Sequence, residues 1–204
     1  MIVPVLIDEH RYRQGIAPQV GDDVRWQLFW NEPFAGWWPG LRPGWSLTAA
    51  LRPAASEPVT HLGARPEDNT LMQPAIGTVG ALRVHCTAQI PVPDTVVLSG
   101  AVRLKAGLRP RADTPQSHPL GRPGEVAYTE GVIAGMHLVS IKLDYRAHPQ
   151  WPAWHRREPI AGSERIYDLD QPPAELHTHW PDGDTQGAVR VEELLVDLDL
   201  TGNR

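Results

Sequence analysis

Proline and glycine interrupt this chain so often that they argue against an all-helical fold. The 204 residues include 21 prolines and 18 glycines, which is above the roughly 12% expected for the two types together. Proline lacks the N–H that a helix interior needs, and glycine is unfavourable there because of its backbone entropy. The hydrophobic fraction of 41% is that of a globular protein. We therefore expect a packed fold made mainly of short strands.

The net charge and the composition of the first residues limit the classes of protein to which this chain can belong. The formal net charge of −5 disfavours non-specific binding to nucleic acid or to an anionic membrane. No segment approaches the ~20 apolar residues that span a bilayer. The first residues lack a basic region followed by an apolar run and a cleavage site, so we expect a cytoplasmic protein. Cys86 is the only cysteine, which excludes an intrachain disulfide and a cysteine zinc cage.

Apolar and polar side chains alternate in several segments, which is typical of half-buried strands. The first segment contains Pro4, which cannot donate a ladder hydrogen bond, so we expect it at an edge. Gly131 and Gly135 predict a bend inside a long segment, and a change of phase at Glu192-Glu193 predicts a β-bulge. The predicted strands are residues 2–7, 20–30, 77–86, 96–105, 126–145, 165–169, 176–180 and 188–200.

The remaining segments are rich in proline and tryptophan. Residues 31–74 contain seven prolines and are predicted to be a long loop, apart from a short helix from Trp45 to Leu51 that Pro53 ends. A loop of this length is either functional or mobile. Residues 147–162 are predicted to be a second loop, and residues 108–124 a connection rich in proline and glycine.

Short strands without alternating helices predict an all-β class, as a small antiparallel β-barrel or SH3-like half-barrels with little helix. We expect a single domain over residues 1–204. An alternative division is two related lobes, 1–107 and 125–204, joined by 108–124. It is favoured by the alignment of residues 77–84 on residues 131–138 without gaps. The competing explanation is that strands starting with glycine resemble one another by chance.

His177, Thr178 and His179 form the best candidate metal site. Alternation along a strand places both imidazoles on one face, close enough to share a metal. Asp182 follows in a turn and offers an oxygen ligand, and such a set suits zinc, iron or manganese. A third ligand from elsewhere, such as His85 or His137, would complete it. The alternative is a solvated pair of histidines beside a turn, with no cofactor at all.

Other reactive residues point to structural roles. Cys86 and His85 are neighbours on a strand and should face opposite sides, so Cys86 is predicted to be a small core residue. His137 lies on an apolar strand and is predicted to be a hydrogen-bonded core histidine. The chain contains no glycine-rich phosphate loop, no GxSxG nucleophile elbow and no HExxH.

Tryptophan is the second compositional feature that suggests a binding site. The chain has eight tryptophans but only two phenylalanines. Exposed tryptophans in loops mark ligand or protein interfaces. The alternative is that long loops use large side chains to anchor themselves on the core. The candidate binding residues are Trp37, Trp38, Trp151 and Trp154.

Three pieces of the sequence together resemble an uncharacterised family of small actinobacterial proteins. They are the GDDVRW segment at 21–26, the segment from Gly77-Thr78-Val79 to His85-Cys86, and the LLVDL segment at 194–198. Members carry a GDxVxW strand, a GxV…HC strand and an LVDL-like terminal strand. The resemblance implies a β fold and a GC-rich bacterial origin, but no activity or catalytic residue.

Two functions are therefore expected from the sequence. The first is a non-catalytic cytoplasmic module that binds a protein or a small ligand through its tryptophan-bearing loops. The second is a metal-dependent enzyme centred on His177 and His179.

Overall fold

The computed structural model describes residues 1–31, 44–61, 69–107, 125–148, 151–179 and 187–201. Most of these residues lie in strands, and the helix among them, α1 (Glu9–Arg13), is short, so the predicted all-β class is confirmed. The strands are β1 (Ile2–Ile7), β2 (Asp23–Phe29), β3 (Ser46–Pro53), β4 (Val59–His61), β5 (Thr70–Val79), β6 (Leu82–Ala88), β7 (Thr95–Ser99), β8 (Val102–Gly107), β9 (Thr129–His148), β10 (Trp151–Pro159), β11 (Arg165–Asp168), β12 (Thr178–His179) and β13 (Gly187–Asp199).

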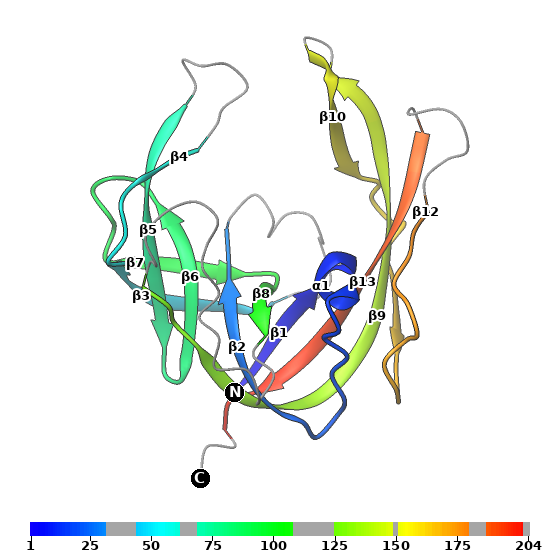
Figure 1. Ribbon diagram of the computed structural model, residues 1–204, viewed down its shortest axis with the longest axis horizontal. Helices are drawn as coiled ribbons and strands as arrows, with labels where there is room; N and C mark the ends of the chain where they lie inside the picture. Colours follow the sequence, from blue (N-terminus) through cyan, green and yellow to red (C-terminus); the bar gives the residue numbers. More distant parts are fainter. Residues whose placement is uncertain (32–43, 62–68, 108–124, 149–150, 180–186, 202–204) are drawn as a thin grey trace.

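The strands follow one hydrogen-bonded path in the order β10-β9-β13-β1-β8-β2-β6-β5-β3-β7. Strands β11, β12 and β4 are added beside β9, β13 and β5. The long strand β9 also pairs with β2, from Asp23 opposite Val132 to Trp26 opposite Thr129. The pairings therefore run from β9 through β13, β1, β8 and β2 back to β9. Figure 1 shows β9 curving from this region up beside β13.

No helix in the described ranges is both long enough and apolar enough to span a membrane.

Strand β1 lies between β13 and β8, so the edge position predicted from Pro4 is wrong. Pro4 sits opposite Asp197 of β13. The register with β8 includes only Val5 and Leu6. Pro4 therefore precedes the part of β1 that pairs with β8.

Two predicted strands are each divided by a glycine. Residues 77–86 span the hairpin of β5 and β6, in which Val79 pairs with Leu82. Gly80 has φ +55° in the two-residue turn, which is a backbone conformation that glycine adopts readily. Residues 96–105 are likewise divided into β7 and β8 around Gly100, where φ is +76°. On each side of the turn, the alternation of apolar and polar residues predicted the strand correctly. It did not reveal the turn itself, because apolar residues continue beyond the glycine.

The two predicted proline-rich loops contain strands. The helix predicted over residues 45–51 is wrong, because residues 46–53 form β3 between β5 and β7. Pro53 ends that strand, and Pro74 lies inside β5 opposite Thr87. Residues 151–159 form β10, which pairs with the end of β9. In these segments long-range pairing outweighs the local signal of proline.

Strand β13 is buried on both faces. This burial explains why the apolar residues shift from one set of alternate positions to the other at Glu192-Glu193. Leu194, Val196 and Leu198 pack into the larger hydrophobic cluster, with residues of β1, β2, β6 and β8. Leu195 faces the other way, into a second cluster with Leu6, Val139, Ile141 and Leu143. The register with β9 is continuous from Gly187 to Asp197. The bulge predicted at Glu192-Glu193 is therefore wrong.

The irregularity lies instead in β9, where Asp197 pairs with Gly135 and Leu198 pairs with Ile133. Ala134 is the extra residue of this bulge, so the bend predicted near Gly135 is confirmed. The segments aligned as a repeat also differ, because residues 77–84 turn at Gly80 whereas residues 131–138 continue in one strand. They are not equivalent elements. The connection 108–124 lies outside the described residues.

Candidate functional site

The four candidate tryptophans are only partly covered by the structure. Trp37 and Trp38 lie outside the described residues. The backbone of Trp151 and Trp154 lies in β10 rather than in a loop, and the placement of their side chains is outside the description. The register of β10 with β9 is irregular between Trp151 and His155. Strand β10 is the outermost strand at one end of the path.

The structure describes only some of the proposed metal ligands. His177 is exposed, and its backbone N–H donates to Glu192 Oε2 at 3.2 Å. His179 has its backbone in β12 opposite Arg190, and Asp182 is outside the described residues. Within the described ranges, no group of three or more His, Cys, Asp or Glu side chains is placed to hold a metal. The metal site stays a prediction, which elemental analysis of the protein and of a His177→Ala/His179→Ala variant tests.

Cys86 and His85 lie on opposite faces of β6, as predicted. Cys86 is buried in the larger cluster, and burial raises the pKa of its thiol to about 12. The thiol is therefore protonated at neutral pH, and a core role is confirmed. His85 is half-buried, and its Nε2 accepts a hydrogen bond from the Ala127 backbone N–H at 3.2 Å. Burial and then the charge on Lys105 lower the pKa of His85 to about 4.

His137 is hydrogen-bonded, as predicted, and it joins three strands. Its Nδ1 lies 2.7 Å from Asp168 Oδ1 on β11, and its Nε2 lies 3.1 Å from Asp197 Oδ2 on β13. The arrangement holds β11 against β9 and β13.

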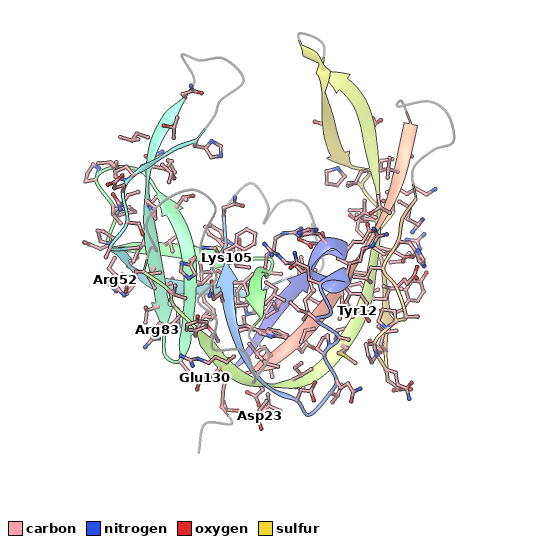
Figure 2. All side chains as sticks on the ribbon, viewed as in Figure 1. Tyr12, Asp23, Arg52, Arg83, Lys105 and Glu130 are labelled. Atoms are coloured by element: carbon pink, nitrogen blue, oxygen red, sulfur yellow. The ribbon has the colours of Figure 1, made fainter. Side chains whose placement is uncertain are left out.

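The positive charge of Lys105 acts on His85, and that of Arg11 acts on Lys105. The sequence analysis did not single out Lys105 or Arg11. Strands β6 and β8 flank β2, because Leu28 pairs with residues of both. His85 follows the β6 residue of this pair, and Lys105 follows Leu104 at an irregular step in the β2–β8 register. Figure 2 shows Lys105 near the middle of the molecule, between β6 and α1 in this view.

The charges of these residues act on one another in pairs, Arg11 on Lys105 and Lys105 on His85. Burial and then the positive charge of Arg11 lower the pKa of Lys105. Lys105 in turn acts on His85, as described above. Arg11 belongs to α1, which packs against β8. The only signal in the sequence was compositional, since Lys105 is one of two lysines in the chain.

Comparison of the chain with protein-family models, with curated proteins and with solved structures found no match. The resemblance to an actinobacterial family therefore stays a prediction.

Proposed function

We propose that this protein is a cytoplasmic, non-catalytic binding module that holds an acidic segment of a partner protein against β10. The observation that carries the proposal is the position of Trp151 and Trp154 on this outermost strand, which is paired only with β9 in the described part of the chain. Arg156 and Arg157 follow on the same strand. Tryptophan and arginine are the residue types most enriched among those that dominate binding energy at protein interfaces.

The proposed mode of recognition uses side chains more than backbone pairing. Pro152 has no N–H to offer, which limits the addition of a further strand along β10. Tryptophan supplies a large contact area with little conformational freedom to lose. Neighbouring residues of a strand face opposite sides, so each face of β10 has one of these two arginines, whose planar donors suit carboxylates. An acidic partner segment therefore matches the composition of this strand.

We further propose that the scaffold is a small closed β-barrel. The return of the pairing path from β2 to β9 supports this closure. A closed ring removes exposed edges from the five strands that form it. Strand β10 lies outside that ring and so offers an outer surface for binding without disturbing the core.

The test compares partners captured by the protein with those captured by a Trp151→Ala/Trp154→Ala variant. A partner that only the parent enriches is then purified, and its affinity is measured by calorimetry. We expect the double substitution to weaken binding by about tenfold or more. Circular dichroism establishes that the variant is folded.

A matched control replaces the exposed Ile166 and Tyr167 of β11 by alanine. Strand β11 also pairs with β9, on residues 137–140. We expect this control to bind as the parent does. Equal binding by the parent and the tryptophan variant would show that β10 is not the interface.

A further inference from the structure

Strand β7 is the last strand at the other end of the pairing path from β10, and in the described part of the chain it pairs with β3 alone (Figure 1). An edge strand presents N–H and C=O groups that can pair with another chain. Proteins usually protect such an edge with charged side chains, proline or a bulge. Residues 95–99, Thr-Val-Val-Leu-Ser, contain no charge and no proline, and their register with β3 is continuous. The edge of β7 therefore lacks the usual protection.

The register with β3 shows which backbone groups of β7 point outward. The Leu51 N–H donates to the Asp94 carbonyl at 2.8 Å, and this pair continues the β3–β7 register by one step. Hydrogen-bonded pairs alternate with non-hydrogen-bonded pairs along an antiparallel ladder. The backbone groups of Val96 and Leu98 therefore point towards β3. Those of the alternate residues 95, 97 and 99 point to the open edge.

These outward groups are open to a further strand. The Ser99 carbonyl accepts a hydrogen bond from Trp30 Nε1 at 3.1 Å, which leaves it a second lone pair. Within the described structure, the outward backbone groups of Thr95 and Val97 have no hydrogen-bond partner. Water satisfies them in a single copy of the chain, and a second strand would satisfy them by direct pairing.

The side chains of β7 divide between the core and solvent. Leu98 is buried in the larger hydrophobic cluster, and Val96 packs against that cluster. Val97 is on the opposite face and is 54% exposed. A strand added beside β7 would therefore extend an apolar layer on one face and cover an exposed valine on the other.

We propose that a second copy of this chain docks at this edge, by antiparallel pairing of the two β7 strands about Val97. Among the registers that join outward groups to outward groups, this is the one that pairs all five residues of the strand. It places Val97 opposite Val97 of the other copy, Val96 opposite Leu98, and Thr95 opposite Ser99. Apolar residues thus meet apolar residues and hydroxyl groups meet hydroxyl groups. Such self-complementarity is what a two-fold interface requires.

The absence of charge on β7 favours a second copy as the occupant. In a two-fold pair every charge on the strand would approach a charge of the same sign, which destabilises cross-strand pairs. The sequence of β7 avoids this repulsion. The interface uses no residue of β10, so it stands or falls independently of the proposed partner surface.

Sedimentation equilibrium of the whole chain, from about 1 µM to about 1 mM, tests the association. A junction of five residues is small, so we expect the mass to rise from the 22.6 kDa of one copy towards twice that value in the upper part of the range. A mass that stays at one copy up to about 1 mM overturns the proposal.

A charge at the centre of the junction tests its location. Val97→Lys places two like charges opposite each other, so we expect it to weaken association by about tenfold or more. The matched control is Val20→Lys, which changes another exposed valine, 50% exposed in the turn before β2. This control should associate as the parent does. Association of Val97→Lys as strong as that of the parent would place the interface elsewhere and overturn the proposal.

Mixing oppositely charged variants tests the register. Val97→Lys and Val97→Glu should each associate weakly alone, and their equimolar mixture should recover association, because the register puts position 97 of one copy opposite position 97 of the other. A mixture of folded variants that recovers nothing overturns this register. If circular dichroism shows that either variant does not fold, amide hydrogen exchange of the parent decides. The N–H groups of residues 95, 97 and 99 should then exchange more slowly at high protein concentration, and unchanged exchange overturns the proposal.

Discussion

Arg103 and Glu193 form a bidentate ion pair inside the fold. The distances are 3.0 Å for Nη1–Oε1 and 3.2 Å for Nη2–Oε2, and the side chains are only 10% and 7% exposed. Arg103 belongs to β8 and Glu193 to β13, which lie on either side of β1. The pair therefore spans β1, with each charge compensated by the other.

Replacing Glu193 by glutamine should lower the free energy of unfolding by about 3 kcal/mol, because it removes the carboxylate that pairs with the buried guanidinium of Arg103. Urea denaturation followed by circular dichroism measures the change. A double variant, Arg103→Met/Glu193→Leu, should recover part of the loss, since neither charge is then buried.

The matched control is Glu130→Gln, which removes an exposed partner of Arg25 at 3.2 Å. Both side chains of that pair are more than half exposed, so the loss should stay below about 1 kcal/mol. If Glu193→Gln costs no more than Glu130→Gln, the buried pair does not stabilise the fold.

His85 should make the protein less stable in mild acid. Its pKa is about 4 in the folded protein, against the usual 6.5, so the unfolded chain binds the proton more tightly. The stability contributed by the neutral His85 is fully present above pH 6.5, and it is lost as the pH drops from 6.5 towards 4. Allowing for the solvent-exposed part of the ring, the loss is roughly 2 kcal/mol.

Thermal unfolding of the parent and of His85→Gln across this pH range measures the effect. Glutamine can still accept the Ala127 N–H, but it does not titrate, so the variant should show a flatter profile. Glu125 does not interfere with this comparison. Its pKa of about 2 in the folded protein places the loss of stability caused by its own protonation between pH 4.5 and pH 2. Parallel profiles for the two proteins would refute this role of His85.

Single residues were predictable where alternation along one strand decides their environment. Cys86 was expected in the core and His137 in hydrogen bonds, and both expectations are confirmed. The electrostatic effect of Arg11 on Lys105 was not predictable, because it depends on α1 packing against β8. Residues so far apart in the chain leave no local pattern when they meet.

The positions of strands in the sequence were predicted more accurately than the residues where they end or the strands with which they pair. Trp26, Leu28 and Trp30 are buried on one face, as their alternation required. The turn at Gly80 was missed because apolar residues continue on both sides of it. Residues 46–53 were assigned to a helix, since a short apolar segment has no distinct period. Their pairing with β5 and β7 is decided by distant parts of the chain.

Gly131 is the position where β9 depends most directly on the absence of a side chain. A Cβ there would lie 2.7 Å from the Asp199 carbonyl oxygen and 2.9 Å from Leu200 Cδ2. Gly131 pairs with Val24 of β2, and the next residue pairs with β13. Gly131→Ala should therefore cost about 3 kcal/mol of stability, because backbone must move to admit a methyl group.

Gly77→Ala on β5 is the control for this prediction. The nearest atom to its Cβ would be Val84 Cγ1 at 3.1 Å, a side-chain atom that can shift slightly. The expected loss is about 1 kcal/mol. Urea denaturation of both variants gives the comparison, and an equal loss at the two positions would contradict the close approach of β9 to β13.

The two halves of the chain are interleaved throughout the sheet. Strand β1 pairs with β13 over six residues, Ile2 to Ile7, and β2 pairs with β9. The larger hydrophobic cluster takes residues from both halves, including Leu28 and Leu104 from the first and Met136 and Leu194 from the second. Neither half can complete this cluster by itself, so burial of its apolar surface requires the other.

Residues 1–107 and 125–204, produced as separate fragments, should therefore lack cooperative unfolding when each is alone. Mixed in equal amounts, they should form a complex that regains strand content and unfolds in one transition. Circular dichroism and sedimentation of each fragment and of the mixture measure this, with the intact chain as reference. Two independent lobes would behave oppositely, because each fragment would then unfold cooperatively and the mixture would be only their sum. Interleaved pairing between β1 and β13 makes complementation the expected result.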